Sequence, residues 1–576
     1  MKILISPFSD RLPDNDETRE SWSVDQILLY QKDISSDLID SIINLIHDEA
    51  TLYVPTVLDV TNALSYDGAD FALQLLMKAI SCDICRIQIY LMGIENQSMF
   101  MLKYKYPNIL KLPNIKYVYF NKYEVRRFDE AFDCIPTHQE YINMLDALGI
   151  QLPSSFHTTH SVTNEWCTYK WSSFLNINKG GSFDLPQALY FDYLKTKFHL
   201  SEDRFERKAE RIFDKVKALP ESKILVVDDN CRWHRFFTEF FADTKIEVKC
   251  IGSDFKRKDV DMIVAEVNNI IDSFAPNVIL LDYRLIEDAD YSNQKDVSGV
   301  TVLRKLKGTA DKPGCCFGRQ IIMFTATSRI ENILRLKRFY ADGFILKEKP
   351  LEYIGKKTSD EVLSSAIQTI SDAINRAKFL VPLNVRLSTL SGLTEYVGQE
   401  TREEINKVAN SVRTITQGNE LTKNVLKLVC LDIFGLIEAI SRDRSIVKTN
   451  SEEGRIEVIP YPKAESIIVS DGTRCTISRT EAEGPNRWNL KVCDKVDNWI
   501  KNKEQSRIDL NVVIIALILF RANKKCVDET KWNQIRCLRN KIVHNSKELG
   551  IGELQRLSLD MLTLLEDVIV PKRANQ

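Results

Sequence analysis

Four short apolar runs in the middle of the chain each end in a polar residue. The first run precedes a pair of acids and the second precedes a single acid. The third run precedes a threonine and the fourth a lysine. These runs are residues 224–227, 278–281, 321–324 and 343–346. Because continuous apolar runs are typical of parallel strands buried on both faces, the pattern predicts a doubly wound parallel α/β sheet.

The polar residues that follow these runs are expected to lie together. They are Asp228, Asp229, Asp282, Thr325 and Lys347. In open α/β sheets the site lies beyond the carboxyl ends of the strands. Three ionised carboxylates need a cation, and oxygen ligands suit Mg²⁺. A lysine and a hydroxyl beside an acid suit a phosphoryl group, which an aspartate can accept covalently. The plain alternative is a domain whose acids merely end strands.

Residues 222–380 resemble the receiver domain of bacterial response regulators on these motifs. The resemblance implies that Asp282 accepts a phosphoryl group from a sensor histidine kinase. It also implies that Asp228, Asp229 and Asp282 hold Mg²⁺, helped by the backbone carbonyl of Arg284. The chain would then act in a two-component phosphorelay.

The same resemblance implies roles for residues near the last two strands. Thr325 and Lys347 would contact the phosphoryl oxygens, and Phe344 stands at the position of the aromatic switch residue. The usual proline after the lysine is replaced by Glu348. Lys347 is preferred as the phosphate lysine because it ends the strand directly, and Lys349 remains the alternative.

Composition limits the remaining function classes. The 576 residues are enough for roughly three or four domains. A net charge of −2 gives no overall basic field for nucleic acid. Thirteen scattered cysteines favour a reduced, cytoplasmic protein. The longest apolar run, residues 510–520, is too short to span a bilayer, so we expect no membrane association.

The first 130 residues also have an α/β pattern. We expect a degenerate receiver-like domain, because Ser6-Pro7 stands where the acid pair should be; the alternative is a generic small α/β domain. Asp59 is not expected to be a phosphoacceptor. Strands are expected at residues 2–6, 52–58, 86–92 and 115–120, and helices at residues 24–30, 37–48 and 69–80.

Residues 131–221 are read as a linker region of helices and loops. Trp166, Tyr169 and Trp171 cluster there, and such density is typical of a packed core or an interdomain joint. A charged amphipathic helix is expected at residues 201–219. Beyond it, the receiver-like domain should close with a helix at residues 359–379.

Residues 381–576 are expected to form a mainly helical domain with a β insertion at about residues 455–493. Near its end, Arg539, Asn540 and His544 stand on one predicted helix, with Asn540 and His544 one turn apart. An imidazole and a guanidinium suffice in principle for metal-free cleavage of RNA. The pattern resembles the Arg–x4-6–His motif of HEPN domains, which usually work as dimers and often cleave RNA.

Two functions follow from these patterns. One is a response regulator in which phosphorylation of Asp282 controls a HEPN-type ribonuclease, an RNA endonuclease that works as a homodimer. The other is a signalling scaffold whose helical domain only dimerises or binds a partner. The resemblance to HEPN domains implies the catalytic residues of the first but leaves the second open.

Overall fold

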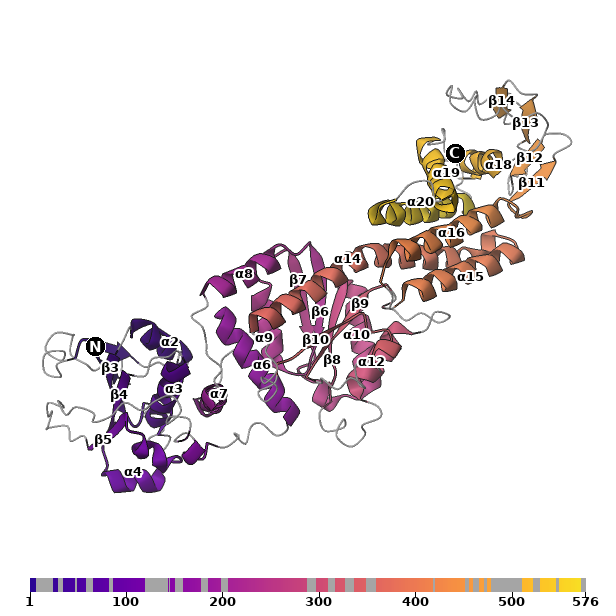
Figure 1. The fold of residues 1–576 in the computed structure, drawn as a ribbon. Coiled ribbons are helices and arrows are strands. Elements are labelled where there is room, and N and C mark those ends of the chain that lie inside the picture. Colours follow the sequence, from indigo (N-terminus) through magenta and orange to yellow (C-terminus); the bar gives the residue numbers. More distant parts are fainter. Residues whose placement is uncertain are drawn as a thin grey trace.

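A computed structural model defines three bodies that follow one another along the chain (Figure 1). The first and second are parallel α/β sheets with helices, and the third is mainly helical. The structure describes residues 1–6, 24–29, 35–46, 49–58, 66–81, 86–119, 143, 146–150, 159–177, 185–197, 206–286, 297–308, 316, 318–326, 336–348, 359–417, 420–450, 455–458, 466–470, 474–477, 510–521, 529–544 and 549–570.

The N-terminal body is a five-stranded parallel sheet with the strand order β2-β1-β3-β4-β5. Its strands are β1 (Lys2–Ser6), β2 (Gln26–Leu29), β3 (Glu49–Pro55), β4 (Arg86–Gly93) and β5 (Ile115–Tyr119). Helices α2 (Ser35–Leu45), α3 (Asp67–Ser81) and α4 (Gln97–Lys103) alternate with these strands, and residues of α6 (Thr159–Leu175) and α7 (Leu185–Lys197) complete the core.

One predicted helix of this body is wrong. Residues 24–30 were expected to be helical, but β2 is a strand that pairs in parallel with β1, with Ile27 opposite Leu4. A short apolar run has no periodicity that separates helix from strand, and the edge of the sheet decides its conformation. The strand expected at residues 52–58 also ends earlier, at Pro55.

The central body repeats the same topology. Its strand order is β10-β9-β8-β6-β7, so the first strand in sequence again pairs with the second and third. The strands are β6 (Ser222–Val227), β7 (Ile246–Ile251), β8 (Val278–Asp282), β9 (Gln320–Thr325) and β10 (Gly343–Leu346). The predicted doubly wound sheet is confirmed, and the edge strand β7 is an addition to it.

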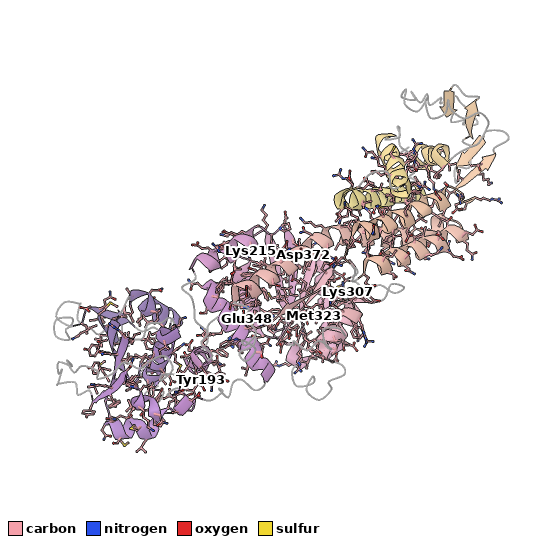
Figure 2. The ribbon with its side chains drawn as sticks, viewed as in Figure 1. Tyr193, Lys215, Lys307, Met323, Glu348 and Asp372 are labelled. Atoms are coloured by element: carbon pink, nitrogen blue, oxygen red, sulfur yellow. The ribbon has the colours of Figure 1, made fainter. Side chains whose placement is uncertain are left out.

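Helices cover both faces of the central sheet. In β6, Ile224 and Val226 point to one core while Leu225 and Val227 point to the other. This two-sided burial explains why the runs are continuously apolar. The first face packs on α8 (Glu206–Lys217), α9 (Cys231–Phe240) and part of α14 (Ser359–Gly392), and the second on α10 (Val260–Phe274) and α12 (Ser298–Lys307). Lys215 of α8, which is labelled in Figure 2, donates to Ser364 of α14 at 2.7 Å.

The helix expected to stop before Pro382 does not stop there. α14 continues to Gly392, with Pro382 inside it. A proline in a helix interior costs about 3 kcal/mol. The cost is offset by burial, because Leu383, Leu387 and Leu390 beyond the proline lie in the C-terminal core. One helix therefore runs from the central sheet into the helical body.

The C-terminal body is a helical core with a small sheet beside it. Besides the end of α14, its helices are α15 (Gln399–Thr416), α16 (Lys423–Ile440), α18 (Leu510–Ala516), a π-helical turn (Leu517–Arg521), α19 (Glu529–His544) and α20 (Ile551–Ile569). The predicted β insertion is an antiparallel sheet of β11 (Val447–Asn450), β12 (Arg455–Val458), β13 (Ser466–Ser470) and β14 (Arg474–Ile477). The further strand expected at residues 488–492 lies outside the described residues. Among the helices that the structure describes, none combines the length and apolarity needed to cross a membrane.

Candidate functional site

Three acids meet at the carboxyl edge of the central sheet. β6 ends directly before Asp228 and Asp229, and β8 ends in Asp282. Because β6 and β8 pair in parallel with Val227 opposite Leu281, the two strands end side by side. One carboxylate oxygen from each acid lies within 4.8 Å of the others. The predicted convergence of Asp228, Asp229 and Asp282 is therefore seen in the structure.

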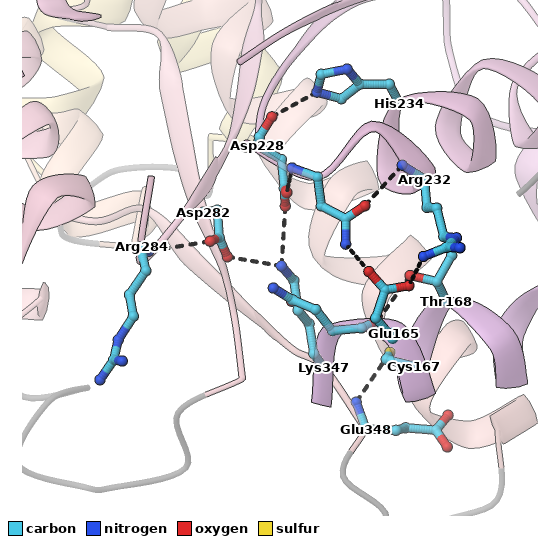
Figure 3. Close-up of polar contacts among 12 residues, drawn as sticks. Glu165, Cys167, Thr168, Asp228, Arg232, His234, Asp282, Arg284, Lys347 and Glu348 are labelled. Carbon is cyan, nitrogen blue, oxygen red and sulfur yellow. Dashed lines mark hydrogen bonds and ion pairs between the residues drawn. The ribbon is translucent and has the colours of Figure 1, made fainter. Parts of the chain in front are cut away.

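Lys347 reaches the same point from the end of β10. Its Nζ lies 2.8 Å from Oδ1 of Asp282 and 3.1 Å from Oδ2 of Asp228, and all three side chains are buried (Figure 3). The ammonium also lies 4.3 Å from the ring centroid of Phe324. Lysine is thus the buried cation that keeps two buried carboxylates together.

Burial shapes the electrostatics of this cluster. It raises the pKa of Asp228, an effect that Lys347 opposes and the charge of Asp282 reinforces. For Lys347, burial lowers the pKa, but the two carboxylates outweigh it and the net shift is upward. The lysine is therefore charged, and its single positive charge could not balance all three carboxylates in their ionised forms.

This donor set fits a hard divalent cation. All three candidate ligands are carboxylates, and Asp229 is less buried than the other two, which leaves a side open to water. Mg²⁺ prefers one or two carboxylates and retains several waters. The cluster could therefore hold Mg²⁺ as the sequence predicts, with the excess negative charge as the physical reason.

The remaining predicted residues lie around the acids. Thr325 ends β9 and is fully buried, and its carbonyl accepts from the backbone N–H of Lys347 at 2.8 Å. The backbone N–H of Arg284 donates to Oδ2 of Asp282 at 3.2 Å. Phe344 is half-buried and packs against the core on the α10 and α12 face. Lys349 lies outside the described residues. The roles of Thr325 and Lys349 in phosphate binding, of the Arg284 carbonyl in metal binding and of Phe344 as a switch residue stay predictions.

A glycine brings α12 against the end of β8. A Cβ on Gly299 would lie 2.2 Å from the backbone oxygen of Asp282, closer than any side chain tolerates. The backbone N–H of Gly299 donates to the carbonyl of Tyr283 at 3.1 Å. The start of α12 thus fixes the loop that follows Asp282.

The N-terminal sheet has the same contact without the acids. A Cβ on Gly68 would lie 1.8 Å from the carbonyl oxygen of Pro55, and the Gly68 N–H donates to Thr56 at 3.1 Å. Pro55 therefore stands where the central sheet has Asp282. Continuing the pairing of β1 with β3 places Ser6 beside Pro55, where the central sheet has Asp228. The N-terminal body is receiver-like in fold, and these positions carry no carboxylate.

Several site neighbours could not be found from sequence. Asn230 donates its backbone N–H to Asp228 at 2.9 Å and its side-chain amide to Glu165 at 2.8 Å. Figure 3 labels both of these acids. Glu165 belongs to α6 (Thr159–Leu175), far away in sequence. His234 lies 2.7 Å from the carbonyl of Asp228. Glu348 stood out in the sequence, because the resemblance to receiver domains leads us to expect a proline directly after Lys347.

The predicted ribonuclease residues lie on α19. Asn540 and His544 fall within this helix one turn apart, and the His544 side chain is outside the described part of the chain. Arg539 packs over the ring of Phe434 at 5.0 Å and lies 3.4 Å from Glu438, both on α16. These contacts give Arg539 a role in joining α19 to α16.

Comparisons with known proteins find similarity in solved structures alone. No protein-family model and no curated protein matches the chain. The signal receiver domain of a protein assigned as a Luxo repressor from Vibrio parahaemolyticus is 18% identical, over 28% of this chain and 94% of that one, with a TM-score of 0.19. NtrX from Brucella abortus is 20% identical, over 34% and 35%, with a TM-score of 0.19. A protein assigned as a two-component response regulator with a GGDEF domain is 11% identical, over 65% and 99%, with a TM-score of 0.18. At such TM-scores the alignments add nothing to the geometry described above.

Proposed function

We propose that the chain is a phosphorylation-controlled signalling protein of the two-component type, with Asp282 as its phosphoacceptor. The observation that supports this most is the arrangement of Asp228, Asp229 and Asp282 within 4.8 Å of one another, with Lys347 bound to two of them. Mg²⁺ bound there would neutralise the acids and the incoming phosphoryl oxygens. A sensor histidine kinase is the expected partner.

The chemistry is transfer of a phosphoryl group from a phosphohistidine. A carboxylate oxygen of Asp282 forms a bond to phosphorus, and the P–N bond breaks with its electron pair going to the imidazole nitrogen. Lys347 lies 2.8 Å from Asp282, so its ammonium is placed to neutralise a transferred phosphoryl oxygen. Thr325 at the end of β9 would donate its hydroxyl to another oxygen.

Phosphorylation by a small acyl phosphate, such as acetyl phosphate with Mg²⁺, tests this function. We expect one phosphoryl group per chain in the wild type and none in Asp282→Asn, measured by intact-protein mass. Asp272→Asn, which removes an exposed acid of α10 that is remote from the edge, is the matched control and should be labelled normally. Equal labelling of the Asp282→Asn protein would disprove the proposal.

We propose two alternative functions for the helical body. A HEPN-type ribonuclease would use Arg539, Asn540 and His544 in a homodimer. A non-catalytic scaffold would use the same helices for dimerisation or partner binding. The ion pair of Arg539 with Glu438 and its stacking on Phe434 favour the scaffold, because they occupy the guanidinium within one chain.

An RNA cleavage assay on the purified full chain separates the two. The scaffold predicts no cleavage by wild type and no difference on changing His544 to Ala. Cleavage that falls at least a hundredfold in His544→Ala would establish the ribonuclease instead, since a general acid–base typically contributes that much. Lys541→Ala, on the same helix, is the control for loss of local charge.

A further inference from the structure

Helix α6 is shared between two hydrophobic cores. Its residues 162–172 are all buried, although the helix is rich in polar residues. Val162, Trp166 and Tyr169 belong to the core of the N-terminal body. Trp171 and Leu175 belong to the core of the central body. A helix embedded on two sides moves with both bodies or breaks its contacts with one of them.

Glu348 ties this helix to the lysine of the acid site. The indole N–H of Trp171 donates to Oε1 of Glu348 at 2.7 Å, and the backbone N–H of Glu348 donates to Sγ of Cys167 at 3.2 Å. Lys170 lies 3.5 Å from Oε2 of the same carboxylate. Glu348 follows Lys347 directly. The residue that α6 holds is therefore joined by one peptide bond to the residue that supplies the cation of the site.

A second set of contacts ties α6 to the acid pair. Glu165 accepts from Asn230 at 2.8 Å and forms an ion pair with Arg232, which also donates to Gln187 at 3.1 Å. Gln187 lies on α7 (Leu185–Lys197), a helix that packs on α3 of the N-terminal body. Asn230 in turn donates to Asp228 at 2.9 Å. The residues that follow the acid pair and the residue that follows Lys347 are thus held by the same helix.

We propose that α6 is an intramolecular latch that reads the state of the acid site and passes it to the N-terminal receiver-like domain, with Glu348 as its positioning residue. The proposal rests on the proposed function only in taking Mg²⁺ as the ligand. A cation at the acids competes with Lys347 for oxygens of Asp228 and Asp282. When Lys347 shifts, Glu348 shifts with it and its bonds to α6 are strained or lost.

The latch can be measured at the acid site, as Mg²⁺ affinity, or at α6, as hydrogen exchange. The contacts of α6 with Glu348 are strongest while Lys347 holds both acids, and bound Mg²⁺ weakens them. A variant that loosens these contacts must therefore raise the affinity for Mg²⁺ by the same factor. Glu348→Ala is therefore expected to tighten Mg²⁺ binding about fivefold, a size typical of such coupling. Glu348→Gln keeps an acceptor for Trp171 and should change the affinity less. Glu247→Ala, which removes a surface glutamate of β7 paired with Lys223, is the matched control.

Calorimetric titration of the full chain with Mg²⁺ and hydrogen exchange of residues 159–175 make the test. The latch predicts faster exchange in α6 for Glu348→Ala without metal, and faster exchange in wild type on adding Mg²⁺. Trp171→Phe, which keeps an aromatic ring but removes the indole N–H donor, should act in the same direction if Glu348→Ala does not fold.

The outcomes separate the two proposals. The latch alone is overturned if wild type binds Mg²⁺ and the Mg²⁺ affinities of Glu348→Ala and Trp171→Phe equal that of the Glu247→Ala control. Unchanged exchange of α6 on adding Mg²⁺ does the same. Wild type that binds no Mg²⁺ overturns the metal site on which both proposals depend.

Discussion

Lys347 is the residue on which the charge balance of the site depends. It is buried between Asp228 and Asp282, and removing one partner of such a group leaves uncompensated charge in the interior. Lys347→Ala should destabilise the central body by about 3–5 kcal/mol without Mg²⁺, and Mg²⁺ should recover part of the loss. Hydrogen exchange of β6 and β8 would report the change.

Lys349→Ala is the control for that variant, because Lys349 is the alternative phosphate lysine. If Lys347 is the lysine of the site, Lys349→Ala should leave labelling by acetyl phosphate unchanged. If Lys349→Ala abolished labelling by acetyl phosphate while Lys347→Ala did not, the assignment of the lysine would be reversed.

Single residues at strand ends could be placed from sequence because parallel strands end together. Asp228, Asp282 and Lys347 needed only the order of four apolar runs. Glu165 and Arg232 could not be found this way, since their contact depends on how a distant helix docks. The Arg539 ion pair with Glu438 was hidden for the same reason.

At the scale of elements, the start of α12 holds the loop beyond Asp282. Gly299→Ala would place a Cβ 2.2 Å from a backbone oxygen, so the helix must move away from β8. We expect a loss of about 1–3 kcal/mol and slower labelling of Asp282, measured by exchange of β8 and by the rate of phosphorylation.

Gly435→Ala gives the matched comparison. This glycine lies inside α16, and a Cβ there meets nothing within 4 Å. The same substitution should therefore stabilise its helix by about 0.5–1 kcal/mol and leave labelling unchanged. Equal effects from both variants would contradict the role assigned to the Gly299 contact.

Elements were predictable where the pattern was long or buried on two faces. The buried strands β6, β8 and β9 are continuous apolar runs, whereas β7 alternates at an edge and gave no such signal. α14 continues past Pro382 because the leucines that follow this proline are buried in the core of the C-terminal body. Tertiary packing overrides local propensity in both cases.

At the scale of the molecule, two helices connect three bodies. α6 joins the N-terminal body to the central one, and α14 joins the central body to the helical one (Figure 1). The central sheet therefore lies between both connections, and its acid edge contacts α6 directly. The cluster of aromatics at residues 166–171 indicated a packed core or an interdomain joint, but its contact with the acid site needed the structure.

The position of the phosphoryl group tests the central claim most directly. The full chain would be labelled with acetyl phosphate and Mg²⁺ and reduced with borohydride, which converts an aspartyl phosphate to homoserine. Peptide mass spectrometry would then locate the homoserine. Conversion at Asp282 alone is the predicted result. Conversion at Asp228, Asp229 or another acid, or at none, would contradict the account.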